Sequence, residues 1–166
     1  STTAAANVTL TYTADSTYSD PASQTVVVNH TIPAGTALVR YDGPTASDDQ
    51  SDLDDGTNFT RFFGAVKVES DIPVVAIVNQ ESTAGAGAQS GTYNGASLGD
   101  ASTRVSVPLV QADFYSYYTS LTIQNTAGTA ANITVEYPSD GTYSAVKNAT
   151  RSYSHTIPAN GQVNIY

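Results

Sequence analysis

Polar and apolar residues alternate in two segments of the chain, residues 7–13 and residues 132–138. The apolar positions are Val8, Leu10 and Tyr12 in the first segment and Ile133, Val135 and Tyr137 in the second. A period of two residues is typical of a β-strand that buries one face. The pattern therefore predicts a strand in each segment.

These two segments open the two copies of an internal repeat. Residues 7–41 align without a gap with residues 132–166, and 14 of the 35 aligned positions are identical. A match at a fixed offset indicates a repeated structural unit. We expect a full unit to be longer than either copy, with opening strands that the first copy lacks and closing strands that the second copy lacks.

A turn is predicted within each copy, where the sequence HTIPA is followed by Gly35 or Asn160. Proline fixes φ and has no N–H to donate, and glycine or asparagine tolerates the turn that follows. Each copy is therefore expected to contain a strand, a turn and a further strand that ends at Tyr41 or Tyr166.

The rest of the chain also has the composition of strands, and we find no convincing helix. Further runs predicted to be strands are residues 59–70, 72–80, 102–110 and 116–125. The small polar residues 81–101 are predicted to be a long loop, which is usually functional or flexible. We predict an all-β fold, an immunoglobulin-like or Greek-key β-sandwich of ten or eleven strands. Its two portions are residues 1–100, with an acidic loop at 42–57, and residues 101–166, and both can pack as one domain.

Composition and charge exclude several classes of protein. Aspartate and glutamate total 15 against 6 lysines and arginines, giving a net charge of −9, whereas a nucleic-acid binder needs a basic surface. The absence of cysteine excludes disulfides, thiol catalysis and cysteine-bound zinc. The longest apolar run, residues 73–78, is too short to cross a bilayer. We expect neither nucleic acid as a partner nor membrane insertion.

The chain is predicted to be secreted, and to be extracellular or attached to a cell surface. It does not begin with methionine, which is expected after removal of a signal peptide or cleavage from a precursor. Five asparagines lie in Asn-x-Ser/Thr sequences, which accept N-linked glycans on exterior proteins. They are Asn7, Asn29, Asn58, Asn132 and Asn148. The alternative is that asparagine and threonine are simply abundant here.

The acidic segment is a candidate calcium site. Its carboxylates are Asp48, Asp49, Asp52, Asp54 and Asp55, preceded by Asp42. Calcium takes six to eight oxygen ligands, which carboxylates on a loop can supply. The spacing differs from the helix-loop-helix calcium pattern, and a solvated acidic loop is the competing interpretation. No other cofactor is expected.

Aromatic residues cluster at Phe114, Tyr115, Tyr117 and Tyr118. They can pack in the core, contact another subunit or stack on a glycan, and aromatic residues are enriched at interfaces. The two histidines, His30 and His155, occupy equivalent positions beside the predicted turns, so we interpret them as structural. No nucleophile elbow, zinc-protease motif or phosphate loop is present, and we predict no enzymatic activity.

Several segments resemble tandem β-sandwich modules of large secreted surface proteins of filamentous bacteria. The matching sequences are VVAIVNQ (74–80), TYNGAS (92–97) and the stretch from VPLVQ through QNTAG to TVEYPSDGT (107–142). The resemblance implies an extracellular scaffold without catalysis. This chain is shorter than such arrays and has the acidic insertion, which favours a small subunit that gains length by assembly.

We therefore predict a structural subunit of an extracellular filament, sheath or tube. Copies of the chain would join head to tail by β-strand complementation, in which a strand of one copy completes the sheet of the next. The predicted assembly residues are Val8, Leu10 and Tyr12 in one terminal strand and Val163 and Ile165 in the other. The alternative is an adhesin-like module that binds glycan or another surface, and an accessory domain of a secreted hydrolase is a third interpretation.

Overall fold

The computed structural model describes residues 4–22, 24–40, 53, 62–82, 89–114, 117–142, 144 and 149–165. Eleven strands lie within these ranges, nine of which have four or more residues. They are β1 (Ala6–Ala14), β2 (Thr25–Ile32), β3 (Gly64–Ser70), β4 (Ile77–Ser82), β5 (Gln89–Asn94), β6 (Ala112–Phe114), β7 (Tyr117–Tyr118), β8 (Leu121–Gln124), β9 (Ala131–Pro138), β10 (Thr150–Ile157) and β11 (Gln162–Ile165). A single turn of 3-10 helix, η1 (Leu98–Asp100), is the helical element of the described part.

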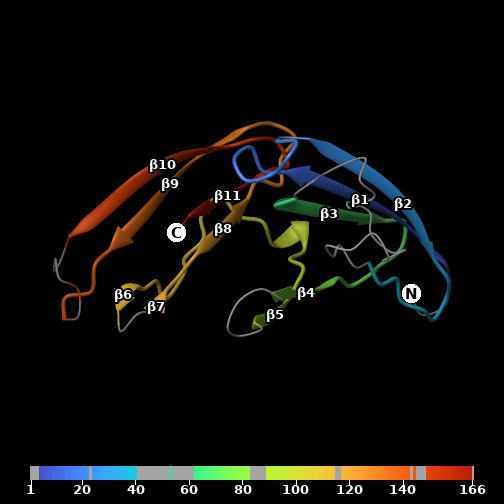
Figure 1. The fold of residues 1–166 in the computed structure, drawn as a ribbon, viewed down its shortest axis with the longest axis horizontal. Helices are drawn as coiled ribbons and strands as arrows, with labels where there is room; N and C mark the ends of the chain where they lie inside the picture. Colours follow the sequence, from blue (N-terminus) through green and yellow to red (C-terminus); the bar gives the residue numbers. More distant parts are fainter. Residues whose placement is uncertain are drawn as a thin grey trace.

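The prediction of an all-β chain is confirmed, and all strand pairs in the described ranges are antiparallel. The sheets are small: one has three strands in the order β2-β1-β3, and the pairs β9–β10, β8–β11, β4–β5 and β6–β7 form the others (Figure 1). Within the described ranges no strand pair joins the portion before residue 100 to the portion after it. The sandwich arrangement and the two-portion division stay predictions.

The core lies on one face of β1. Its alternate residues Ala6, Val8, Leu10, Tyr12 and Ala14 are buried, as the period-two pattern predicts. Leu53 joins them, and partly buried side chains from β2, β3 and the adjoining segments surround them. Burying an aliphatic side chain of this size contributes about 1.5–3 kcal/mol. The β1 stripe is therefore the main source of stability in the three-stranded sheet.

β3 begins at Gly64 because β1 and Phe62 approach closely there. Gly64 lies opposite Ala14 in the β1–β3 ladder. A Cβ at Gly64 would overlap the carbonyl oxygen of Thr13 and press on the ring of Phe62. The absence of a side chain lets β3 approach the end of β1.

The two hairpins β1–β2 and β9–β10 have the same register. Asn7 pairs with Thr31 in the first hairpin, and Asn132 pairs with Thr156 in the second. Each position is displaced by 125 residues, the offset of the sequence repeat. In Figure 1 the two hairpins diverge from the top of the molecule, with β9–β10 on the left and β1–β2 on the right.

The loops at the ends of the two hairpins also correspond. The carboxylate of Asp15 accepts a hydrogen bond from the backbone N–H of Thr17 at 2.7 Å, and that of Asp140 accepts one from Thr142 at 2.6 Å. Each aspartate thereby forms a local turn within the loop that joins its strands.

The predicted turns after HTIPA are present in both copies. The N–H of Thr36 bonds the carbonyl of Pro33, and the N–H of Gly161 bonds that of Pro158. Gly35 and Asn160 have φ values of 69° and 53°. Glycine and asparagine are the residues that adopt this left-handed backbone most readily.

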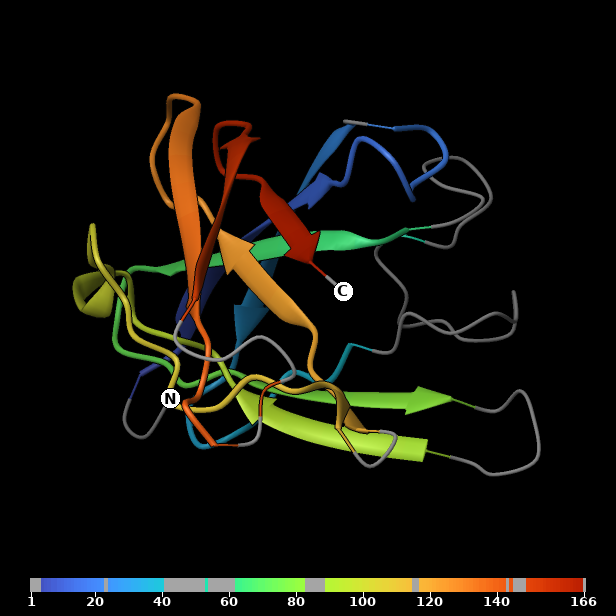
Figure 2. The ribbon, with the colours of Figure 1, turned by 90° about the vertical axis from the view of Figure 1, so that its left-hand side faces the viewer.

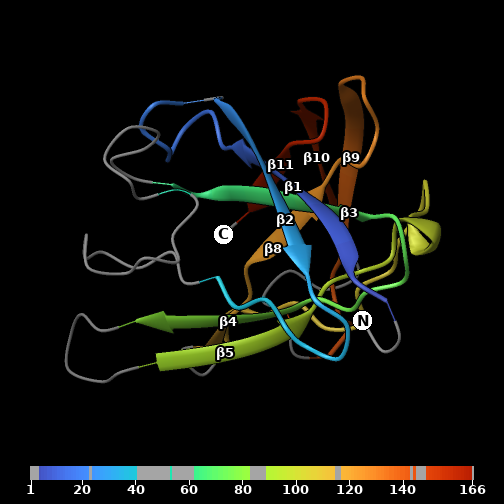
Figure 3. The same cartoon turned by 90° about the vertical axis from the view of Figure 1, so that its right-hand side faces the viewer.

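Three strand predictions are wrong. Residues 37–40 follow the first turn without forming a strand, whereas their counterparts in β11 pair with β8. Residues 102–110 form no strand either, and Val105 and Leu109 are 76% and 66% exposed. Conversely, β5 lies within the predicted loop 81–101, where it forms a hairpin with β4 (Figures 2 and 3). A partner strand, which local sequence does not reveal, decides each case.

Candidate assembly surface

β1, one of the two strands predicted to join copies, has both edges occupied within its own chain. It pairs with β2 on one side and with β3 on the other. Val8, Leu10 and Tyr12 are buried, with exposed fractions of 3%, 8% and 6%. In the isolated chain β1 therefore offers no open edge, because its own sheet already uses the hydrogen-bonding groups on both sides, and its role in joining copies stays a prediction.

The seam between β1 and β3 ends in a clamp between Asn7 and Asp71. The backbone N–H and the side-chain Nδ2 of Asn7 donate to the two carboxylate oxygens of Asp71, at 2.9 and 2.7 Å. The N–H of Asp71 returns a bond to the carbonyl of Asn7 at 3.3 Å. Hydrogen bonds from the backbone and then from the side chain of Asn7 lower the pKa of Asp71 below its usual range, because they stabilise the carboxylate.

The other end of the seam is closed by Ser19 and Phe63. The buried Ser19 hydroxyl donates to the carbonyl of Phe63 at 2.6 Å and accepts from its N–H at 3.0 Å. The N–H of Asp15 bonds the same carbonyl at 2.8 Å. The ring of Phe63 meets Tyr18 edge to face, with 5.6 Å between centroids. β3 is thus held to the first hairpin at both ends.

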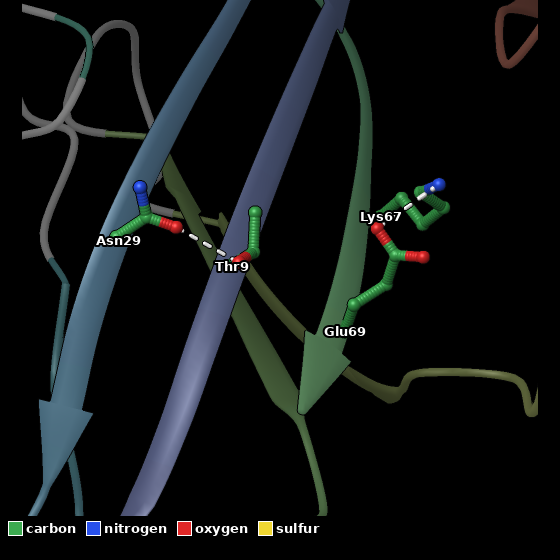
Figure 4. Close-up of polar contacts among 4 residues, drawn as sticks. All are labelled: Thr9, Asn29, Lys67 and Glu69. Atoms are coloured by element: carbon green, nitrogen blue, oxygen red, sulfur yellow. Dashed lines mark hydrogen bonds and ion pairs between the residues drawn. The ribbon is translucent and has the colours of Figure 1, made fainter. Parts of the chain in front are cut away.

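The outward face of this sheet is polar. The hydroxyl of Thr9 on β1 donates to the side-chain oxygen of Asn29 on β2 at 2.8 Å, and Lys67 on β3 lies 3.1 Å from Glu69 (Figure 4). Similar threonine–asparagine bonds join directly opposite residues elsewhere in the β1–β2 pair and in three other strand pairs. They are Thr31–Asn7, Thr92–Asn79, Thr122–Asn164 and Thr156–Asn132. These pairs could not be predicted from the sequence, because they depend on the register between strands. Cross-strand pairs of this kind contribute about 0.2–1 kcal/mol each.

β9, the repeat counterpart of β1, pairs with β10 alone. In the described part of the chain no strand pairs with its other edge, which we call the open edge of β9. The N–H of Ser139 bonds the carbonyl of Ala149, beyond the end of β10, so odd-numbered residues of β9 direct their N–H groups toward β10. The alternation of an antiparallel ladder then directs the N–H groups of Asn132, Thr134 and Glu136 toward the open edge.

The inward face of β9 is also less covered than that of β1. Ile133, Val135 and Tyr137 are half-buried, whereas their counterparts on β1 are buried. Tyr137 packs edge to face on Tyr153, which is itself 52% exposed, with 6.0 Å between ring centroids. The side chains that pack on the β1 face come from β2, from β3 and from Leu53, Phe62, Ile72 and Val74, and in the described ranges no third strand pairs with β9.

β11, the other predicted assembly strand, pairs with β8, and Val163 and Ile165 are half-buried on it. The buried Asn125 ties the turns around this pair together. Its Nδ2 donates to the carbonyls of Thr129, Ile157 and Pro158, and its Oδ1 accepts from the N–H of Ala127 at 3.0 Å. This asparagine belongs to the QNTAG segment, and the sequence alone indicates no role for it.

The remaining predicted sites divide between described and undescribed residues. Asn7, Asn29 and Asn132 are exposed. Asn58, Asn148 and the proposed calcium ligands Asp48, Asp49, Asp52, Asp54 and Asp55 lie outside the described residues. Within the described ranges no group of three or more acidic or histidine residues could hold a metal ion. Glycosylation and calcium binding stay predictions.

The aromatic cluster and the histidines also occupy defined places. The backbone of Phe114 pairs with that of Tyr117 in the β6–β7 ladder, and Tyr118 pairs with Ala112, whereas Tyr115 lies outside the described residues. His30 and His155 are half-buried at equivalent positions of β2 and β10, opposite Val8 and Ile133. The structural interpretation of the two histidines agrees with these positions in the ladders.

No family model, curated protein or solved structure matches the chain. Among the residues described, no helix is long and apolar enough to cross a membrane. The features that bear on function are therefore the open edge of β9 and the exposed apolar residues of the strands and loops.

Proposed function

We propose that this chain is a structural subunit of an extracellular filament, sheath or tube, and that its copies assemble head to tail by pairing β-strands. The observation that carries the proposal is the open edge of β9, together with the half-buried apolar face beside it. An unpaired edge presents a row of N–H and C=O groups that another strand can bind. Main-chain hydrogen bonds would supply affinity, and the alternating side chains would set the register.

The exposed surface of the chain supports a role that requires partners. Large apolar side chains among the described residues are exposed, including Val39 at 66% and Val75 at 93%. Where such side chains lie together, they form the kind of patch that proteins bury against another chain.

We also infer that the small sheets are layers of an immunoglobulin-like sandwich that a neighbouring copy completes. The matched hairpins support this inference, because the first is covered by β3 and the second has no such cover among the described residues. The repeat in the sequence would then mark two incomplete units rather than two complete ones.

Electron microscopy of the purified chain tests the proposal. We expect ordered polymers after negative staining, and more of them at high ionic strength, because the net charge of −9 opposes assembly and salt screens it. Parallel samples contain either calcium or a chelator with sodium chloride at the same ionic strength. More polymers in the calcium samples would show an effect of calcium beyond charge screening. Monodisperse particles under all conditions would refute the proposal and favour an adhesin-like binding module.

A further inference from the structure

We infer that the β9–β10 hairpin of one copy takes the place of the β1–β2 hairpin against β3 of a second copy. The inference builds on the proposed function, for which it identifies the two joining surfaces. In the isolated chain the β1–β2 hairpin pairs with β3. The β9–β10 hairpin of another copy has the same register and can displace it.

The apolar faces of the two hairpins correspond position by position. The residues of β1 that face the core are Val8, Leu10 and Tyr12, and those at the same positions of β9 are Ile133, Val135 and Tyr137. β3 places Val68 opposite Leu10 and Val66 opposite Tyr12. A hairpin docked in the same register would bring Val135 and Tyr137 to these two valines, and would cover a face that is half-buried in the isolated chain.

The clamp at the end of the seam would also be reproduced. Asn132 has the position of Asn7, and its Oδ1 accepts from Thr156 at 2.8 Å just as that of Asn7 accepts from Thr31. Its backbone N–H and Nδ2 correspond to the groups of Asn7 that hold the carboxylate of Asp71. No described carboxylate bonds Asn132 within its own chain, so Asp71 of a second copy fits there.

Charge favours the second hairpin at one position. Thr11 of β1 lies opposite Lys67 of β3, and the residue at the same place on β9 is Glu136. After exchange the carboxylate of Glu136 would lie directly across the ladder from the lysine of the second copy. Opposite charges at facing positions stabilise a strand pair, whereas threonine provides no charge.

One residue opposes the exchange. Pro138 replaces Thr13, which faces Ala65 of β3, and it has no N–H to donate to the open edge. The docked ladder would therefore use the N–H groups of Asn132, Thr134 and Glu136. Proline at this point weakens one end of the ladder, and proline on an edge strand also disfavours pairing with other strands.

The exchange can extend into a polymer. Each copy has one β3 and two hairpins that fit it, so β3 of each copy can accept a hairpin from the next copy while the second hairpin of the same copy is donated onward. This contact joins different surfaces on the two partners, and such contacts form open chains when the rotation does not close. Each copy still has one ladder on β3, but that ladder now joins two chains instead of two parts of one chain. Assembly is therefore favoured by a high protein concentration.

A reversible lock on the first hairpin tests the inference. The double variant Thr11→Cys/Lys67→Cys places two cysteines on facing residues of β1 and β3, in a chain that has no other cysteine. Facing residues in an antiparallel ladder lie about 4.5–5.5 Å apart at Cα, within the range of a disulfide. We expect oxidation to abolish filaments and reduction to restore them, because the disulfide prevents the β1–β2 hairpin from leaving β3.

The matched control is Thr9→Cys/Asn29→Cys, which locks β1 to β2 and leaves the hairpin free to leave β3. This variant should form filaments whether oxidised or reduced. Filaments from the oxidised Thr11/Lys67 variant would overturn the inference and leave the proposed function intact. Absence of filaments from the unmodified chain in every condition would instead refute the proposed function.

A second pair of variants tests the register directly, in samples of the full chain mixed at high concentration. Glu136→Cys/Lys67→Cys should give ladders of disulfide-linked copies on a non-reducing gel. In the variant Thr134→Cys/Lys67→Cys, the cysteine on β9 lies on the same face but two residues from the position expected to face residue 67. This variant should give far fewer disulfide-linked copies. Equal ladders from the two variants, or none from the first while filaments form, would overturn the predicted contact.

Discussion

The two repeat-related tyrosines, Tyr12 and Tyr137, offer a matched comparison of how well each hairpin is covered. Tyr12 is 6% exposed and meets the ring of Phe62 edge to face, with 5.9 Å between centroids. Tyr137 is half-buried and meets Tyr153, which is 52% exposed. The same substitution to alanine at both positions removes the same atoms from a covered site and from a partly covered one.

We expect Tyr12→Ala to lower the free energy of unfolding by about 3–5 kcal/mol, the usual cost of removing a buried aromatic ring. The edge-to-face contact with Phe62 accounts for about 0.5–1.5 kcal/mol of that loss. Tyr137→Ala should cost about half as much, roughly 1.5–2.5 kcal/mol, because part of its ring is already in water.

Urea unfolding followed by circular dichroism measures both losses in dilute, unassembled protein. With a slope of about 2 kcal/mol per molar urea, the two variants should differ in midpoint by about 1 M. Circular dichroism is preferable to fluorescence, because the chain has no tryptophan and each variant loses a tyrosine. Equal losses in the two variants would show that β3 and its neighbours do not protect the first hairpin, and would refute the basis for the hairpin exchange.

Two further substitutions test the hydrogen-bond networks. Asn125→Ala should destabilise the chain by about 2–4 kcal/mol in guanidinium unfolding, since it leaves buried carbonyls without their donor; a loss under about 1 kcal/mol would mean that water replaces the amide. The lowered pKa of Asp71 means that its bonds to Asn7 contribute stability above the usual carboxyl pKa, and that this contribution is lost as pH falls below about 4 through the lowered pKa. Asp71→Asn should therefore be less stable than the parent at pH 7 and lose less stability between pH 5 and pH 2, and identical pH profiles would contradict this reasoning.

The sequence did not predict which strand edges of the candidate assembly surface are paired. The alternation at Val8, Leu10 and Tyr12 predicted a strand with a buried face, and that strand is present, but the alternation did not indicate that both of its edges are paired within the chain. The counterpart strand, with Val135 and Tyr137 at its centre, has the same alternation and an open edge in the described part of the chain. Periodicity reports which face of a strand is buried, and it carries no information on how many neighbours the strand has.

The sequence by itself determined the local features of this protein. Strands β2 and β10 end where HTIPA begins its turn, and Gly35 and Asn160 adopt the left-handed backbone that follows, because these preferences depend on adjacent residues alone. The tertiary structure alone decided which strands have partners: residues 37–40 remain outside any strand, β5 forms in a segment expected to be a loop, and β3 covers one hairpin of the two. Strand pairing joins residues that are distant along the chain, so a local pattern can mark a strand without identifying the neighbour that completes it.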